Sequence, residues 1–282
     1  MSRIQNILDK AEREGAVRRV RPETVVATAE PGTPLPPTLD DVPRYAPASA
    51  AQAYSPDLAA AVPPPTPGRI IAGAQIDPRL VTRATSDTAV AEQYRALRTR
   101  IVHADPLSPI HVVMVTSPGR GAGRTLTAGN LAMTMAQEWQ RRICIVDADL
   151  RHPYLHRLFG LPDGPGLCDV LAGQATLDEA LVTLEEHQVT ILPAGHVPAH
   201  PAELLGTTAM RRTLETLRTQ YDRIVIDAAP AAPLADVSIL APLVDRVLMV
   251  VRAGVTTKPD IQDALGAVES AKLLGFVLNG TA

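Results

Sequence analysis

The globular part of the chain alternates short apolar runs with longer stretches that mix apolar and polar residues. The apolar runs have the length of strands, and we expect strands at 111–116, 142–147, 189–194, 223–228, 246–252 and 276–279. The longer stretches are predicted as helices at 89–104, 124–138, 201–219, 235–241 and 258–273. A strand that is apolar along its whole length suits a sheet whose two faces are both covered. The pattern therefore predicts an α/β fold, with a doubly wound, mostly parallel sheet and helices on both faces.

The first 69 residues have a different pattern. Apolar residues recur at helical spacing in 2–14, which predicts a short helix. The next segment, 20–69, contains 12 of the chain's 26 prolines. Because proline removes a backbone donor and fixes φ, neither helix nor sheet can extend through this segment. We therefore expect three parts: a short N-terminal helix in 1–19, a flexible Pro/Ala-rich linker in 20–69, and a folded domain in 70–282.

Composition narrows the functional classes. The net charge of −3 argues against a general nucleic-acid binder. The N-terminus is charged throughout, unlike a signal peptide, and no apolar run approaches the roughly 20 residues that cross a bilayer. The two cysteines, Cys144 and Cys168, cannot build a disulfide framework. A cytoplasmic protein without direct membrane insertion is expected.

Glycines follow the first predicted strand in the sequence SPGRGAGRT, residues 117–125. Glycine lets backbone N–H groups turn inward around an anion, and a helix N-terminus adds partial positive charge at the same point. Thr125 is placed to offer its hydroxyl to Mg²⁺. The strand, glycine loop and helix together predict a phosphate-binding loop, and the alternative is an ordinary turn between a strand and a helix.

Three aspartates stand at the ends of predicted strands. Asp147 and Asp149 follow the strand after the glycine loop, and Asp227 ends another strand. Ligands bind outside the carboxyl ends of strands in an open parallel sheet, and carboxylates there can hold Mg²⁺. One such aspartate would be read as the cap of the next helix. Three of them beside a glycine loop predict a site for a nucleotide with Mg²⁺.

These motifs give the chain a family resemblance over residues 76–279. It is carried by IDPRLV, AEQYRALRTRI, SPGRGAGRT, IVDADLRHPYLHRLFGL, GLCDVLAG, ILPAGHVPAHPAELL, YDRIVIDAAP and VLNG. The chain resembles the bacterial tyrosine kinases of capsule and exopolysaccharide synthesis, of the CpsD/CapB type. These belong to the P-loop ATPases, together with the partitioning and division-site proteins. The resemblance implies a P-loop NTPase fold with ATP and Mg²⁺ as cofactors.

The resemblance also implies roles for individual residues. It assigns catalysis to Asp147, Asp149 and Arg124, and metal binding to Thr125, Asp147 and Asp227. The nucleotide contacts that it implies are Ser117, Gly119, Gly121, Ala122, Gly123, Arg124, Thr125, Leu126 and Asn279. In the family, the first aspartate of the DAD motif helps to activate the tyrosine hydroxyl and to organise Mg²⁺.

A further motif concerns self-association. Glu92, Arg95 and Arg98 match the family's E-x-x-R-x-x-R motif, which implies a homo-oligomer. Positions i, i+3 and i+6 lie along one side of a helix, where they could meet carboxylates of a neighbour. The alternative is a solvated helix face with local ion pairs.

The chain departs from the family pattern at three places. Arg124 stands where the loop ordinarily carries lysine, and a planar guanidinium does not have the geometry of a compact ammonium. Ala228 follows Asp227, which matches the family's Walker B aspartate, at a position where the family has threonine, so a hydroxyl is lost. No tyrosine follows Tyr221, so the expected acceptors in this chain are Tyr45 and Tyr54 on the linker.

The function expected from the resemblance is a cytoplasmic, MgATP-binding tyrosine kinase that regulates exopolysaccharide or capsule synthesis and chain length. The implied partner is a transmembrane chain-length-determinant (Wzz-like) activator, which would recruit the chain to the inner face of the plasma membrane. Because of Arg124, a pseudokinase or nucleotide-gated scaffold remains the alternative. A partitioning-type ATPase is a third interpretation, although such proteins carry an extra lysine early in the loop and 116–125 contains none.

Overall fold

The structure is a computed structural model that describes residues 68–81, 87–104, 109–137, 141–268 and 272–280. The helix expected in 2–14 and the linker tyrosines Tyr45 and Tyr54 lie outside the described residues. Within the described part, no helix is both long and apolar enough to cross a membrane.

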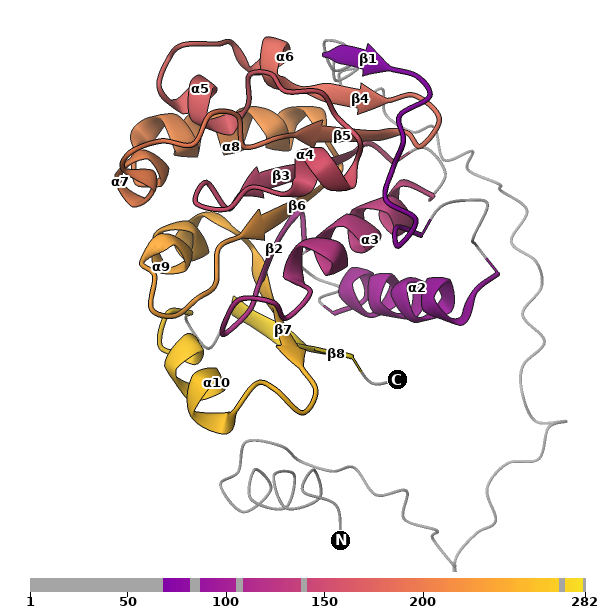
Figure 1. The fold of residues 1–282 in the computed structure, drawn as a ribbon, viewed down its shortest axis with the longest axis vertical. Coiled ribbons are helices and arrows are strands. Elements are labelled where there is room, and N and C mark those ends of the chain that lie inside the picture. The colour runs from indigo at the N-terminus through magenta and orange to yellow at the C-terminus, as the bar shows by residue number, and fades with distance from the viewer. Residues whose placement is uncertain (1–67, 82–86, 105–108, 138–140, 269–271, 281–282) are drawn as a thin grey trace, which may run out of the picture. The chain divides into compact units, whose positions relative to one another are not determined.

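A single sheet organises the described residues (Figure 1). Its eight strands lie in the order β1-β4-β5-β3-β6-β2-β7-β8. In chain order they are β1 (Arg69–Ile71), β2 (Val112–Thr116), β3 (Ile143–Ala148), β4 (Val182–Leu184), β5 (Val189–Leu192), β6 (Arg223–Ala228), β7 (Arg246–Arg252) and β8 (Leu273–Asn279). Neighbouring strands are parallel except β4 and β5, which are antiparallel. The expected mostly parallel sheet is confirmed.

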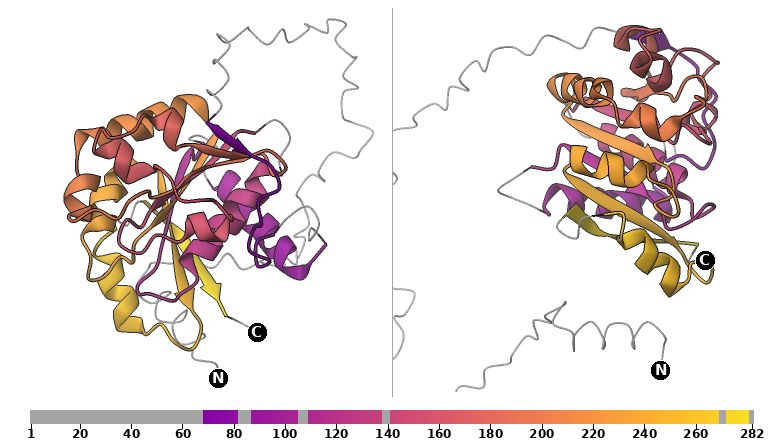
Figure 2. Two further views of the ribbon diagram at one scale, coloured as in Figure 1. Left: turned by 45° about the horizontal axis from the view of Figure 1, so that its top comes forward. Right: turned by 90° about the vertical axis from the view of Figure 1, so that its left-hand side faces the viewer.

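Helices cover both faces of this sheet. They are α2 (Ala89–Val102), α3 (Arg124–Ala136), α4 (Leu155–Leu158), α5 (Leu167–Leu171), α6 (Leu177–Ala180), α7 (Pro201–Leu205), α8 (Thr208–Gln220), α9 (Asp236–Leu240), the 3₁₀ turn η3 (Ala241–Leu243) and α10 (Lys258–Leu265). One core cluster joins the sheet to α5–α10, and a second joins it to α2, α3 and α4. In the left-hand view of Figure 2 the orange and yellow helices lie on one side of the strands and the purple helices on the other.

The central strands are buried because they have helices on both sides. Every residue of β2 and β3 is buried, as the uniformly apolar runs predicted. Helix α3 is buried on nearly all sides, since it lies between the sheet and α2. At Gly129 of α3 an added Cβ would lie 2.9 Å from Leu158 Cδ2, so glycine allows α4 to pack closely on this helix. The most buried helix of the fold therefore begins at the phosphate-binding loop.

Some element boundaries differ from the predictions. The helix expected at 201–219 is two helices, α7 and α8, with Gly206 as the last helix-like residue of α7. The helix expected at 258–273 ends at Leu265, and Leu273 already belongs to β8. Strands β1 and β4 and the short helices α4, α5 and α6 were not predicted. Each of these has five residues or fewer, too few for an apolar period to show.

The register of the sheet places the acidic residues. Asp147 of β3 lies directly opposite Asp227 of β6, near the carboxyl ends of both strands. Val115 of β2 pairs with Asp227 on the other side, just before the loop that begins at Ser117. The loop and two of the predicted carboxylates therefore meet at one edge of the sheet.

Candidate nucleotide-binding site

The loop after β2 has the backbone of an anion-binding turn. Gly121 and Gly123 have φ values of 75° and 86°, in the left-handed region that favours glycine. Gly123 is the residue before α3, so the first N–H groups of this helix face the loop. The hydroxyl of Ser117 donates to the carbonyl of Gly119 at 2.7 Å and closes the start of the turn. Gly119 itself has no positive φ, and nothing lies within 4 Å of a Cβ built there.

Asn279 holds this loop from the far end of the sequence. Its side-chain nitrogen donates to the carbonyl of Ala122 at 2.8 Å, and its oxygen accepts from the N–H of Gly280. A Cβ added to Gly123 would lie 1.9 Å from the Nδ2 atom of Asn279. Glycine is therefore required at position 123 for two reasons: the backbone is left-handed there, and the Asn279 amide lies where a Cβ would be. Asn279 was expected as a nucleotide contact, and in the structure its amide hydrogen-bonds the phosphate-binding loop.

Arg124 lies between two of the three aspartates. Its Nε donates to Asp227 Oδ1 at 2.9 Å, and an Nη2 hydrogen bond of 2.5 Å reaches Asp149 Oδ2. The arginine side chain is only 10% exposed, while Asp149 and Asp227 are 4% and 1% exposed. The planar guanidinium thus joins the loop to the ends of two strands. A lysine would reach these carboxylates only with donors of a single nitrogen, whereas arginine uses two nitrogens of a rigid planar fork.

Asp147 has a different environment. Its Oδ2 accepts the N–H groups of Tyr154 and Leu155, at the start of α4, and its Oδ1 accepts the N–H of Asp149. Burial, together with the nearby charge of Asp227, raises the pKa of Asp147 well above its usual range. The helix-capping interpretation of a strand-end aspartate therefore holds for Asp147, which also remains beside the site.

Asp227 keeps one oxygen without a hydrogen bond. Oδ2 is buried and has no partner among the described residues. Burial raises the pKa of Asp227, and both Arg124 and the hydroxyl of Thr125 oppose this shift. A buried carboxylate oxygen near a threonine hydroxyl is a suitable pair of ligands for Mg²⁺, which prefers oxygen and keeps several sites for water and phosphate. Among the described residues, at this site or at any other, there is no group of three or more His, Cys, Asp or Glu side chains that could hold a metal ion.

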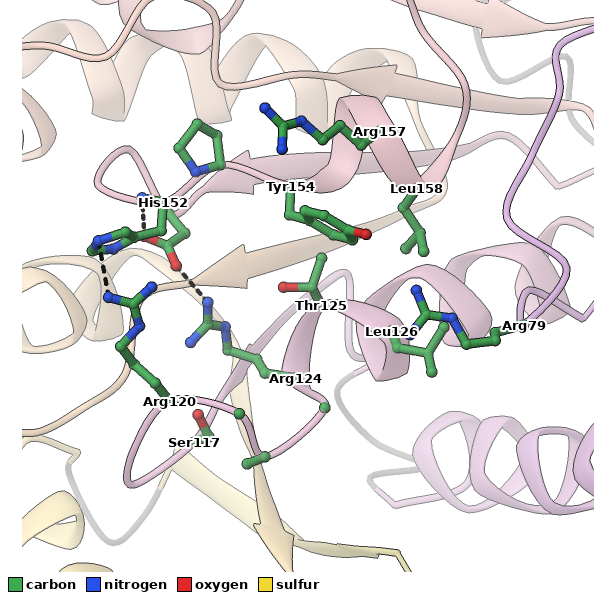
Figure 3. Close-up of a pocket in the computed structure, with 15 residues that line it drawn as sticks. Arg79, Ser117, Arg120, Arg124, Thr125, Leu126, His152, Tyr154, Arg157 and Leu158 are labelled. Atoms are coloured by element: carbon green, nitrogen blue, oxygen red, sulfur yellow. Dashed lines mark hydrogen bonds and ion pairs between the residues drawn. The ribbon is translucent and has the colours of Figure 1, made fainter.

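A cavity of about 450 Å³ opens beside the loop (Figure 3). Its wall is strongly basic, and Arg120 of the loop hydrogen-bonds His152 Nε2 at 3.0 Å. The residues that line it are Arg79, Ser117, Arg120, Gly121, Ala122, Gly123, Arg124, Thr125, Leu126, Asp149, His152, Pro153, Tyr154, Arg157 and Leu158. Figure 3 shows Thr125 near Tyr154, with Arg120 and Arg124 on the side of the loop. A basic cavity at the N-terminus of a helix suits a phosphorylated ligand.

Sequence reasoning did not identify several of these residues. Arg79, His152, Tyr154 and Arg157 come from segments before α2 and after β3, and each lines the cavity. The signal that was available is the run RHPYLHR at 151–157, which begins two residues after the last aspartate of the DAD motif. Its basic and aromatic residues stand at the carboxyl end of a central strand, where ligands of such sheets bind.

The expected self-association residues lie on α2, away from the loop. Glu92 and Arg95 form an ion pair with one another, and Glu92 is 67% exposed. Arg98 Nη1 donates to the carbonyl of Thr134 at 2.8 Å, near the C-terminal end of α3. The local ion pair of the alternative interpretation is therefore present, and Arg98 also ties α2 to α3.

The fold and the site define a P-loop nucleotide-binding α/β domain. A family model described as an AAA domain matches residues 110–272. Tyrosine-protein kinase YwqD of Bacillus subtilis is 32% identical over 210 residues, which cover 74% of this chain and 88% of that protein. Tyrosine-protein kinase etk of Escherichia coli K12 is 31% identical over 205 residues, 72% of this chain. The solved structure of the kinase domain of Escherichia coli tyrosine kinase ETK superposes with a TM-score of 0.68 at 30% identity, over 73% of this chain and 81% of that chain.

The chain belongs to the family of bacterial tyrosine-protein kinases. The relatives differ in length. This chain covers 88% of the Bacillus relative but only 28% of the E. coli K12 one. The residues matched by the family model, 110–272, include the phosphate loop and the strand-end aspartates.

Proposed function

We propose that this chain is an ATP-dependent protein-tyrosine kinase that acts in capsule or exopolysaccharide synthesis. The observation that carries the proposal is the meeting of the glycine loop, Arg124, Asp147, Asp149 and Asp227 at one sheet edge. Relatives that are named tyrosine-protein kinases support the same reaction class. The division into a short N-terminal helix (1–19), a linker (20–69) and a kinase domain (70–282) is part of this proposal.

In this proposal the loop amides hold the phosphates of ATP. The nine residues assigned to nucleotide contact surround the loop and the start of α3, and Asn279 acts through the carbonyl of Ala122. Thr125, Asp147 and Asp227 would hold Mg²⁺, which when bound neutralises charge on the β- and γ-phosphate oxygens. Asp149, at the wall of the basic cavity, would serve the acceptor tyrosine. Phosphoryl transfer depends on positioning and charge, so Arg124 must supply its charge from a fixed place.

The second candidate is a pseudokinase or nucleotide-gated scaffold. The observation that favours it is the double bond of Arg124 to Asp149 and Asp227, which directs the guanidinium to the strand ends. A cation held there stabilises the transferred phosphoryl group less than one placed between the β- and γ-phosphates. In that case nucleotide would bind and regulate assembly without phosphate transfer.

Partners are proposed from the family. The activator would be a transmembrane chain-length-determinant (Wzz-like) protein that recruits this cytoplasmic chain to the inner face of the plasma membrane. The chain would form a homo-oligomer through Glu92, Arg95 and Arg98 of α2. No nucleic acid is expected as a partner, because the net charge is −3.

The test is a phosphotransfer assay with labelled ATP, a tyrosine peptide and the cytoplasmic segment of the membrane partner. A kinase transfers label to tyrosine, and Asp149→Asn abolishes the transfer. Arg151→Lys is the matched control, since Arg151 pairs with buried Asp236 outside the cavity lining. Nucleotide binding without any transfer, with or without the partner segment, would favour the scaffold instead.

A further inference from the structure

The three aspartates at the sheet edge have one cation in contact with two of them. The side chains of Asp149 and Asp227 are 4% and 1% exposed, and both bond to Arg124. Buried carboxylates need a paired charge, because water no longer solvates them. In many nucleotide sites, a bound metal ion is the largest positive charge. Here a side chain of the protein already fills part of that electrostatic role.

The geometry leaves part of the guanidinium available. Nε is used by Asp227 and Nη2 by Asp149, whereas no hydrogen bond of Nη1 is found among the described residues. Arg124 is also the first residue of α3 and lines the cavity beside the loop. Arginine can serve a carboxylate and a phosphate at once because its donors point in several fixed directions. The same side chain can therefore face the aspartates on one side and an anion on the other.

We propose that Arg124 is a built-in counter-cation, through which this chain binds nucleoside di- and triphosphates with little contribution from a divalent metal ion. Arg124 offsets part of the negative charge of Asp149 and Asp227, which would otherwise repel the phosphates more strongly. The buried Oδ2 of Asp227 and the hydroxyl of Thr125 remain suitable for Mg²⁺, so the metal can still bind for phosphate transfer. What Arg124 reduces is the contribution of Mg²⁺ to the affinity for the nucleotide. The inference rests on the proposed function only in taking the loop as a nucleotide site.

The experiment is calorimetric titration of the full chain with ADP, in excess EDTA and in excess Mg²⁺ at matched ionic strength. The measured quantity is the ratio of the two dissociation constants. For the wild-type chain we expect a ratio below about threefold, where tenfold corresponds to about 1.4 kcal/mol. For Arg124→Met we expect a ratio of at least about tenfold, since phosphates then approach unpaired carboxylates.

Two further variants keep the result interpretable. Arg124→Met leaves Asp149 unpaired and could fail to fold, so the double variant Arg124→Met, Asp149→Asn removes that charge as well. It should also show a ratio of at least about tenfold, because Asp147 and Asp227 still lack a cation. Arg151→Lys alters another arginine–aspartate pair, in which Asp236 is buried and Arg151 is partly exposed, and it should keep the wild-type ratio.

A wild-type ratio above tenfold, unchanged in the Arg124 variants, would overturn the inference and leave the proposed kinase function standing. A chain that binds no ADP under either condition would overturn both. Metal-independent ADP binding in a chain that transfers no phosphate would support the inference and refute only the kinase proposal.

Discussion

Nε of Arg124, the first residue of α3, lies 2.9 Å from Oδ1 of Asp227 at the end of β6, across 103 positions of sequence. This contact joins the phosphate loop to the sheet through a planar guanidinium, whose donors have a geometry that a lysine ammonium does not have. Because the same guanidinium also bonds to Asp149, the cation is directed to the strand ends. The arginine at position 124 is therefore a structural feature with consequences that can be measured.

Substitution of Arg124 by lysine should speed phosphate transfer. A lysine ammonium is a compact point charge on a flexible stem and lacks the planar fork that directs Arg124 to Asp149 and Asp227, so it can turn toward the phosphates. We expect turnover of a tyrosine peptide at saturating MgATP to rise at least about tenfold, equivalent to about 1.4 kcal/mol of the barrier. Single-turnover transfer of labelled phosphate measures this. Equal or slower transfer by a variant that still binds ADP would show that the guanidinium serves the reaction well.

Loss of the Asn279 side chain should loosen the phosphate loop. Asn279→Ala removes the hydrogen bond to the carbonyl of Ala122, a loss of about 1 kcal/mol. We expect ADP affinity to fall by about fivefold with a small change in Tm, because the bond orders the loop rather than the core. Calorimetry with ADP and thermal unfolding provide the two measurements. An unchanged affinity would separate Asn279 from nucleotide binding.

A related test concerns Gly123, where the steric overlap with Asn279 and the backbone strain can be measured separately. Gly123→Ala introduces a Cβ that would overlap Asn279 Nδ2 and also strains a backbone with φ of 86°. The double variant Gly123→Ala, Asn279→Ala removes the overlap but not the backbone strain, which costs about 1 kcal/mol for a residue other than glycine. The double variant should therefore bind ADP better than Gly123→Ala alone. If the two bind equally, the backbone conformation alone accounts for glycine at this position.

Stability at acidic pH should depend on Asp245. Burial alone would raise the pKa of Asp245, but bonds from Arg218 and from the N–H groups of Val112 and His111 outweigh it and lower the pKa below 3.8. The stabilising contribution is therefore fully present above pH 3.8 and is lost as the pH falls through the folded value. Asp245→Asn should cost about 1–2 kcal/mol at pH 7, and this difference should shrink below pH 3.8. Urea unfolding at several pH values tests it; a constant difference would contradict the assignment.

The α2 pair should matter for assembly rather than for folding. Glu92 and Arg95 form an exposed ion pair, and such pairs contribute about 0–1 kcal/mol to stability. Alanine at both positions should leave Tm nearly unchanged but shift the proposed homo-oligomer to monomer, measured by light scattering after gel filtration. Arg141→Ala is a suitable control, since its ion pair with Asp222 also lies at the surface, off α2 and outside the cavity lining. If the double alanine variant keeps the molecular mass of the wild-type assembly, the pair of Glu92 and Arg95 stabilises only its own helix.

The main features of the fold could be predicted because its central strands are apolar throughout. Val112–Thr116 and Ile143–Ala148 were placed within one residue, and the glycine spacing located the loop between β2 and α3. Strand β1 could not be predicted, since three residues carry no period and its position depends on pairing with β4. Gly206 was hidden within a helical pattern, so α7 and α8 were read as one element.

The site was only partly readable from the sequence. Strand-end position was enough to bring Asp147 and Asp227 together, because parallel strands end at the same edge. The partner of Arg124 was not readable, since a cation in this loop could face either phosphates or carboxylates. The contact of Asn279 with Ala122 spans 157 positions and depends on where β8 ends. Contacts of this kind follow from tertiary packing and leave no local pattern.

The pairing of Asp147 with Asp227 across β3 and β6 also bears on how the chain reaches its native state. A slip of one residue between these strands would turn one aspartate to the opposite face, among the apolar side chains of the other core. Burying an ionised carboxylate there would cost much free energy. The two aspartates therefore destabilise sheets in which β3 and β6 are misaligned during folding. The two aspartates proposed for the nucleotide site would thus also favour correct strand alignment, and nucleotide added during refolding would stabilise chains that have reached it.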